Sequence, residues 1–377
     1  MKVKSFLLTA LVASMTFVAC DNNDNEMGQL DNTPKSVTIK LANLQKNVTS
    51  RSLDENVTSK AALLNNFTIF FVDGAGNFHD GYAATDVTKD TPLNRDFNAG
   101  DEIPTFHYLD ASVTKVIVVG NRTWEEGTEP VNETKLKALT AAVANLQNVD
   151  ELVLVGEQNL VRNTQENENV PGHTEAYKAE VSILPLIARL EISVFEYAED
   201  TDGGRDYDKI AINQVAVNNY YGTTTFANIN SDLVNATIDQ TTIWPYLENL
   251  GIGWFNDELT DAIELNNTNQ YKHDMLAEVT TENPTANVFA YNVPAGTTVP
   301  QVIVRLTGTK ESKDTPLYLA TRNLSSADNK FQAGYIYRMD AKSPFSFKDT
   351  DLRNPDKCVD VTVEVKPWTV VAVTPEF

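Results

Sequence analysis

The chain is 377 residues long, has 42% hydrophobic residues and carries a formal net charge of −22 at pH 7. This length suits two or three domains, and the apolar content is enough for buried cores. A net charge this negative repels nucleic acids and anionic membrane surfaces, which excludes a nucleic-acid-binding role. The two cysteines, Cys20 and Cys358, are too few for a disulfide framework or a zinc site.

The amino terminus has the pattern of a secretory signal. Lys2 and Lys4 precede an apolar run over 6–18, which is too short for a stable transmembrane helix. The run ends in a small residue followed by Cys20, which resembles the lipoprotein signal of bacteria. An ordinary signal with an incidental cysteine is the alternative. We predict a signal over 1–19, a lipid on the Cys20 thiol and a disordered acidic tether after it.

A short strand is predicted next, over 36–42. Val37, Ile39 and Leu41 share one face, with polar residues opposite. A polar segment over 43–60 follows and contains Arg51, where a protease could reach the chain. The plainer interpretation is the first strand of a β-sandwich followed by an ordinary loop.

The segment 52–174 is predicted to be a small β-sandwich with one helix. Alternating or continuous apolar runs predict strands over 66–72, 114–119 and 152–155. Apolar residues at helical spacing predict a helix over 133–147. A uniformly polar stretch over 163–173 is a plausible linker to the next unit.

The segment 175–377 is predicted to be a second antiparallel sandwich. Strands are expected over 176–184, 186–195, 210–217, 288–292, 301–307, 317–321 and 335–339. The polar stretch 228–287, with scattered aromatic residues, is predicted to form surface loops and short helices. The predicted fold class is therefore mostly β, with two antiparallel, transthyretin-like sandwiches, a short helix and long surface loops.

The last twenty residues, 358–377, give the strongest strand signal in the chain. Val359, Val361, Val363 and Val365 alternate with polar residues, which is typical of a half-buried strand. Pro367 cannot donate to a ladder and ends or kinks that strand. Trp368 and Val370 then begin a second extended piece, so the chain ends on a strand that needs a sheet to cover it.

No catalytic constellation is recognised in the sequence. The four histidines lie apart, and motifs for a nucleophile elbow, a phosphate loop or a dinucleotide site are missing. We therefore predict no enzymatic activity, no catalytic residues, no metal and no cofactor. One acidic loop, Asp200–Asp208, alternates carboxylates around two glycines; calcium binding and a solvated acidic turn both remain open there.

These segments together resemble the fimbrillins, or type V pilins, of Bacteroidales. The resemblance rests on the end of the signal at Cys20, the strand 36–42 followed by Arg51, the strand 116–121, the segment 188–190 and the carboxyl-terminal run through Trp368. It spans nearly the whole chain and is loose outside these places. The alternating strand followed by Trp368 and further valines is the most specific of them.

The resemblance implies a lipidated precursor at the outer membrane and a later life in a surface fimbrium. A trypsin-like protease would cut between Arg51 and Ser52, releasing the lipid and a propeptide over 20–51 that carries Val37, Ile39 and Leu41. The opened groove would accept a donor strand from 358–377 of the next fimbrial subunit, giving a head-to-tail polymer. The assigned donor residues are Val359, Val361, Val363, Val365, Trp368 and Val370.

Two other functions remain open. The chain could be a fimbrial anchor subunit that keeps its lipid, although Arg51 argues against that role. It could also be a lipid-anchored surface protein that binds a glycan or another host or bacterial surface ligand through 228–287. A monomer with a saturable ligand, and without polymer after proteolysis, would favour the second alternative.

Overall fold

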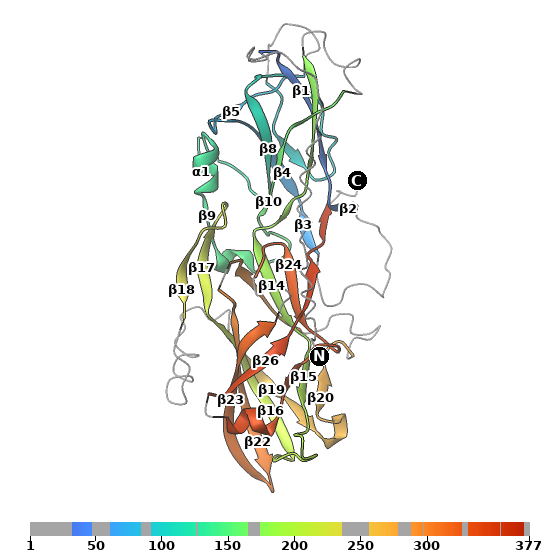
Figure 1. Cartoon of the computed structure of the whole chain (residues 1–377), viewed down its shortest axis with the longest axis vertical. Helices are drawn as coiled ribbons and strands as arrows, with labels where there is room; N and C mark the ends of the chain where they lie inside the picture. The colour runs from blue at the N-terminus through green and yellow to red at the C-terminus, as the bar shows by residue number, and fades with distance from the viewer. Residues whose placement is uncertain are drawn as a thin grey trace, which may run out of the picture. The chain divides into compact units, whose positions relative to one another are not determined.

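The computed structural model describes residues 32–46, 61–83, 92–125, 127–164, 174–235, 256–277, 288–296, 298–325, 331–354 and 356–372. The described part of Thr33–Phe377 belongs to one compact unit. It is built mainly from strands, as Figure 1 shows, which confirms the predicted mostly β fold. Among the described residues, no helix is both long and apolar enough to span a bilayer.

Strands from the first half of the chain form two main sheets. They are β1 (Lys35–Leu41), β4 (Asn66–Asp73), β5 (Phe78–His79), β6 (Asp96–Asn98), β7 (Phe106–Leu109), β8 (Val113–Gly120), β10 (Leu154–Asn159), β11 (Val161–Arg162), β12 (Glu175–Val181) and β13 (Leu184–Pro185). One sheet has the order β11-β12-β1-β7. The other has the order β13-β10-β8-β4-β5, with β6 also paired to β4.

Strands from the second half form three further sheets. They are β14 (Ile187–Ile192), β15 (Val194–Tyr197), β16 (Lys209–Asn218), β19 (Asn256–Asn266), β20 (Lys272–Asp274), β21 (Phe289–Pro294), β22 (Gln301–Lys310), β23 (Lys313–Ser325), β24 (Tyr335–Met339), β25 (Phe345–Phe347), β26 (Cys358–Thr362) and β27 (Glu364–Pro367). Their orders are β21-β14-β24-β27, β20-β15-β25 and β19-β16-β22-β23-β26. Short helix α3 (Asp349–Arg353) precedes β26.

Two small sheets complete the described fold. One has the order β18-β17-β9, from β9 (Thr140–Ala142), β17 (Tyr220–Thr225) and β18 (Asn230–Val234). The other has the order β2-β28-β3, from β2 (Leu44–Lys46), β3 (Ala62–Leu64) and β28 (Val370–Ala372). The second of these joins residues near the two ends of the chain (Figure 1).

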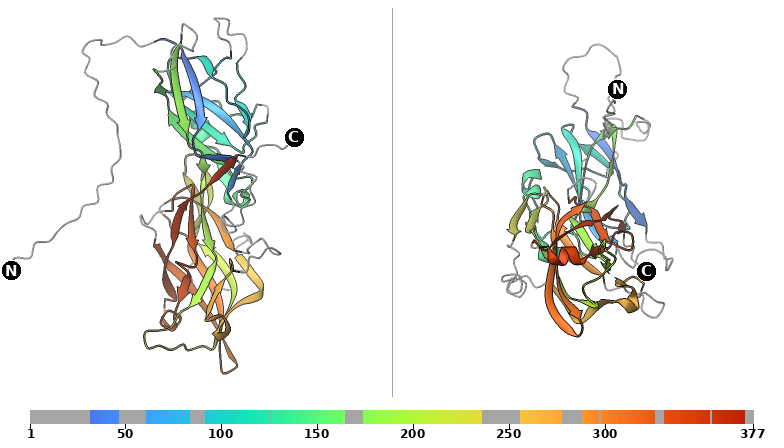
Figure 2. Two further views of the ribbon diagram at one scale, coloured as in Figure 1. Left: turned by 90° about the vertical axis from the view of Figure 1, so that its right-hand side faces the viewer. Right: turned by 60° about the horizontal axis from the view of Figure 1, so that its bottom comes forward.

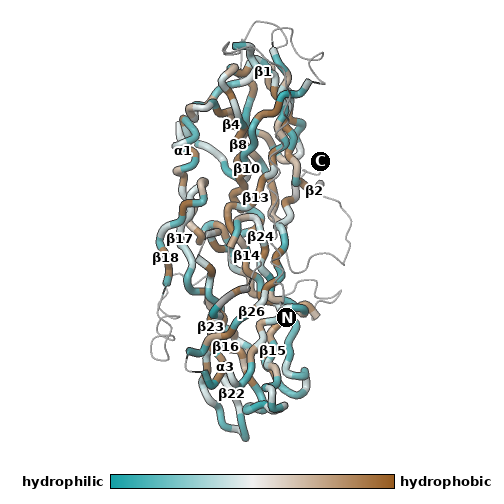
Figure 3. The backbone as a smooth tube through the Cα atoms, in the orientation of Figure 1, coloured by the Kyte–Doolittle hydropathy of each residue, from teal (hydrophilic) through white to brown (hydrophobic). Residues whose placement is uncertain are grey.

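The buried apolar residues form two clusters, called here the first core and the second core. The first core lies between the two sheets of the first half, where strands such as β4 and β8 carry long hydrophobic runs (Figure 3). It also takes in Val181, Ile183 and Leu186, so it extends past the predicted boundary at residue 174. The second core gathers β14, β16, β22 and the start of the carboxyl-terminal stretch.

The predicted helix over 133–147 is wrong in extent. Helix α1 covers Glu133–Lys137 only, and Asn132 caps it by accepting a hydrogen bond from the backbone N–H of Lys135. The chain then forms β9, which pairs with β17, and a 3-10 turn, η1 (Val143–Leu146). Tertiary pairing of β9 thus overrides an apolar spacing that would suit a helix. A second 3-10 turn, η4 (Asn267–Asn269), follows β19.

Candidate functional site

The first predicted site residues lie on β1, which fills the middle of a sheet. β1 pairs in parallel with β12 through its whole length and antiparallel with β7 on its other edge. Figure 2 shows the blue β1 beside the green β12. Val37 and Ile39 are buried in the first core, and Leu41 packs against it. Removing β1 would therefore open a slot lined by two strand edges and by apolar side chains.

Polar side chains fix the register of β1 in this slot. The Ser36 hydroxyl lies 2.8 Å from Nδ1 of His107 on β7 and 2.7 Å from the Thr174 hydroxyl before β12. Lys35 donates from Nζ to the Val113 carbonyl at 2.6 Å. Burial lowers the pKa of His107, which favours the neutral ring beside Ser36. Because a one-residue slip would break all of these contacts, β1 has one preferred register.

The start of the carboxyl-terminal stretch is built into the second core. β26 pairs in parallel with β23 at the edge of its sheet. Val359 and Val361 on β26, and Val363 just after it, are buried in the second core. β27 pairs antiparallel with β24 at the edge of another sheet. On β27, the side chain of Val365 is 38% exposed. The stretch therefore passes from a buried strand to a partly solvent-facing one.

The end of this stretch returns to the first core. Trp368 and Val370 are buried among first-core residues. The Trp368 N–H donates to the Gly334 carbonyl at 2.7 Å, and the Ala62 N–H donates to the Thr369 carbonyl at 2.9 Å. β28 then lies between β2 and β3, parallel to both. The buried members of the predicted donor set are thus divided between the two cores, and Val365 belongs to neither.

A buried charged group lies beside Trp368. The Arg189 guanidinium is 5.6 Å from the centroid of the Trp368 ring, a cation–π distance. Arg189 Nε donates to Glu191 at 2.6 Å, and Arg338 Nε donates to the other carboxylate oxygen at 3.1 Å. Glu191 is fully buried, and the two arginines hydrogen-bond both of its carboxylate oxygens. Arg189 also donates to the amide oxygen of Asn292 at 3.1 Å.

Several predicted positions lie elsewhere. Cys20, Arg51 and Ser52 fall outside the described residues. Cys358 is a half-buried free thiol at the start of β26, and burial together with nearby carboxylates raises its pKa. A raised thiol pKa leaves less of the reactive thiolate at neutral pH.

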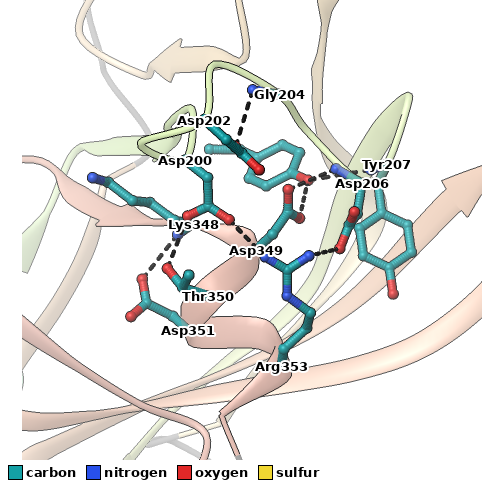
Figure 4. A network of polar contacts seen from close by, with 11 residues as sticks. Asp200, Asp202, Gly204, Asp206, Tyr207, Lys348, Asp349, Thr350, Asp351 and Arg353 are labelled. Atoms are coloured by element: carbon teal, nitrogen blue, oxygen red, sulfur yellow. Dashed lines mark hydrogen bonds and ion pairs between the residues drawn. The ribbon is translucent and has the colours of Figure 1, made fainter.

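The acidic loop Asp200–Asp208 is tied to helix α3 rather than folded around a common centre (Figure 4). Arg353 donates to Asp206 at 2.5 Å and to Asp200 at 2.9 Å. The Asp349 carboxylate accepts from the Tyr197 hydroxyl and from the Asp206 N–H, and burial raises the Asp349 pKa. In the described part of the chain, His, Cys, Asp and Glu side chains form no group of three or more that could hold a metal ion.

The predicted ligand-binding stretch 228–287 is described over 228–235 and 256–277. Contrary to the expected loops and short helices, 256–266 forms the long edge strand β19. A cavity of about 910 Å³ lies along β19 and is lined by Asp257, Asp261, His273 and Phe289, among others. The aromatic residue Tyr271 packs under the Arg205 guanidinium, with 4.0 Å between the Arg205 carbon and the ring centroid.

Sequence reasoning missed the residues that hold β1 and β28 in place. β2 and β3 are three-residue strands, too short to show an alternating pattern. The pairing of Ser36 with His107, and of Trp368 with Arg189, joins residues distant in the sequence. The one available signal was the apolar end of the chain, which indicated that something must cover it.

Comparison with solved structures identifies proteins of Bacteroidales to which the chain is similar. The chain is similar to a candidate cell adhesion protein from Parabacteroides distasonis, with a TM-score of 0.53 and 14% identity over 91% of this chain and 99% of that one. The two proteins share a fold. No protein-family model matches the chain. No curated protein matches it in sequence.

Two further solved structures align at lower scores. A candidate cell adhesion protein from Bacteroides eggerthii gives a TM-score of 0.49 at 14% identity, covering 90% of this chain and 98% of that one. A fimbrilin from Porphyromonas gingivalis gives 0.45 at 13% identity, covering 90% and 99%. The predicted resemblance is confirmed as a likeness of fold, on the structure from Parabacteroides distasonis.

Proposed function

We propose that the protein is a non-enzymatic structural subunit of a surface fimbria that supports adhesion. It would be exported as a lipoprotein, cut after Arg51 and joined head to tail by strand exchange. The observation that supports the proposal is the place of β1, which lies between β7 and β12 and pairs with both. The shared fold with a candidate cell adhesion protein supports the surface role.

The slot left by β1 would favour a replacement strand. Burying an aliphatic side chain stabilises by roughly 1.5–3 kcal/mol, and Val37 and Ile39 are both buried. Two unpaired strand edges would also leave backbone donors and acceptors without ladder partners. An incoming strand that restores the ladder and fills the same pockets would bind by strand addition.

The carboxyl-terminal stretch has the matching pattern. Val359, Val361 and Val363 repeat the two-residue spacing of the buried face of β1 but are buried in the second core of their own subunit. Trp368 and Val370, further along, have the same spacing and begin the part that would exchange. Each subunit would then offer a slot at one site and a donor at another, so the contact is heterologous. A heterologous contact that does not close on itself produces a filament.

The test is proteolysis with an arginine-specific protease followed by negative-stain microscopy. We expect cut protein to form fibres, and Arg51→Ala protein to remain uncut and monomeric. Arg162→Ala, which removes an exposed arginine on β11, serves as the matched control and should behave as the unaltered chain. Fibres from Arg51→Ala, or monomers from cut unaltered protein, would contradict the proposal.

A second candidate function is ligand binding at the cavity beside β19. Its lining joins carboxylates to an aromatic ring, which suits a polar, uncharged or cationic ligand such as a sugar. Asp257 already accepts a hydrogen bond from the Tyr291 hydroxyl at 2.6 Å, which orients its carboxylate at one edge of the cavity. Saturable glycan binding by a monomer that never polymerises would favour this function over the first.

A further inference from the structure

The carboxyl-terminal strand β28 is held between two segments that flank the predicted cut. Leu44, Gln45 and Lys46 of β2 pair with 370, 371 and 372, which in turn pair with 62, 63 and 64 of β3. The chain between β2 and β3 contains Arg51. A cut at that residue therefore separates the two strands that enclose β28.

The two neighbours of β28 lie on opposite sides of the predicted cut in the sequence. β3 is fixed to the first core by Ala62 and Leu64, and Asn121 donates to the Leu63 carbonyl at 2.6 Å. β2 directly continues the segment of β1. Asn43, between them, bonds the backbone of Ile183 through both its amide nitrogen and its amide oxygen, at 2.5 and 2.9 Å. β3 would therefore stay in place after a cut, whereas β2 would leave with β1.

We infer that the amino-terminal segment 35–46 is both the filler of the acceptor slot and a clamp on the donor end of the same subunit. This inference rests on the proposed function and adds a step that regulates when the donor end is released. While the segment is present, β28 has a strand on each side. Once the segment leaves, β28 is paired with β3 only. One cut would then both open the slot and weaken the hold on residues 368–372, called here the tail.

The geometry of the carboxyl-terminal stretch indicates which part the clamp holds. Val359, Val361 and Val363 lie in the second core and have no contact with β2 in the pairing of the sheets. β27 follows as an edge strand with exposed residues, including Val365. The part that the clamp holds begins after β27, at Trp368, and its release needs no disruption of the second core.

The clamp can be tested in the full, uncut chain by hydrogen exchange. Successive N–H groups along a strand point to opposite edges, so either Gln45→Pro or Lys46→Pro removes a group directed at β28. The matched controls are Gln45→Ala and Lys46→Ala, which keep the N–H. We expect one proline variant to raise the exchange rate of the amides of 370–372 about fivefold or more, with the amides of Val37 and Ile39 unchanged.

Unchanged exchange at 370–372 in both proline variants, with β1 still protected, would overturn the clamp. If a proline also unfolds β1, Leu44→Ala is used as a milder change, because Leu44 packs against the first core. The inference is wrong if this variant does not raise the exchange rate of the amides of 370–372. The proposed function fails separately. If fibres form although β2 does not protect the amides of 370–372 in the uncut chain, only the clamp is refuted. If those amides exchange faster in cut protein but the cut protein never polymerises, only the strand-exchange function is refuted.

Discussion

Truncating one buried side chain of β1 should weaken the binding of β1 in its slot, and the loss of free energy should depend on how well that side chain is packed. Ile39 is 5% exposed and belongs to the first core, whereas Lys40, the next residue, is exposed. Replacing a buried isoleucine by alanine costs about 2–5 kcal/mol, because apolar contacts are lost and a cavity remains. Ile39→Ala should therefore lower the free energy of unfolding by at least about 2 kcal/mol.

The same change should alter the kinetics of the cut protein. A loss of about 2 kcal/mol corresponds to about a 30-fold weaker hold on the cleaved segment. We expect this segment to dissociate from cut Ile39→Ala protein correspondingly faster, measured by size-exclusion chromatography, and fibres to appear after a shorter lag. Lys40→Ala is the control, since the ion pair of Lys40 with Glu180 spans 4.0 Å at the surface.

Urea denaturation of the uncut variants measures the first effect. If Ile39→Ala and Lys40→Ala lose the same stability, within about 0.5 kcal/mol, then β1 contributes no packing to the slot. That result would refute the reasoning for a plug held by its apolar face. A stability loss without faster dissociation would show that the segment is held mainly by its backbone ladder.

Three further predictions concern the surroundings of the tail and of β1. Burial lowers the pKa of His107 in the folded protein, so the stability that this residue contributes is present above its unfolded pKa of about 6.5 and is lost as the pH falls through the folded pKa. In thermal melts at pH 7.5 and pH 5, His107→Gln should therefore lose less stability on acidification than the unaltered chain. Glu191→Gln leaves two buried arginines without their carboxylate and should cost about 3–5 kcal/mol in urea denaturation, against about 1 kcal/mol or less for Glu258→Gln in an exposed ion pair. Trp368→Ala should cost about 3–5 kcal/mol because the ring is buried, whereas Val365→Ala, at a partly exposed position, should cost clearly less; equal losses would contradict the assigned burial.

Alternation in the sequence predicted the elements in which one face is buried. β1 follows its predicted range closely, because β-branched residues at every second position suit a sheet with one solvated face. The single strand predicted through Val365 is instead divided into β26 and β27, which lie in different sheets. The helix over 133–147 failed for the opposite reason: its apolar spacing was compatible with α1 followed by a strand and a turn. There, pairing with β17 decides the structure, and such pairing leaves no local trace.

The sequence predicted the separate strands of the candidate site but not the contacts that bring them together. The pattern at Val37 and Ile39 indicated a strand, and the pattern at Val359 indicated another. Nothing local shows that Trp368 returns to the first core or that Leu44 lies beside Val370, because contacts over more than 300 residues depend on the completed fold. Parallel pairing of this kind, as in β2-β28-β3, needs the whole intervening chain to be placed first.

The first core has a consequence for the order of events during synthesis. It contains Val37 near the start of the chain and Val370 near its end, so it lacks residues until the ribosome has made almost the entire polypeptide. Contacts that are this distant in sequence also form slowly, because long loops must close first. We expect this core to close only once the carboxyl-terminal stretch has been synthesised.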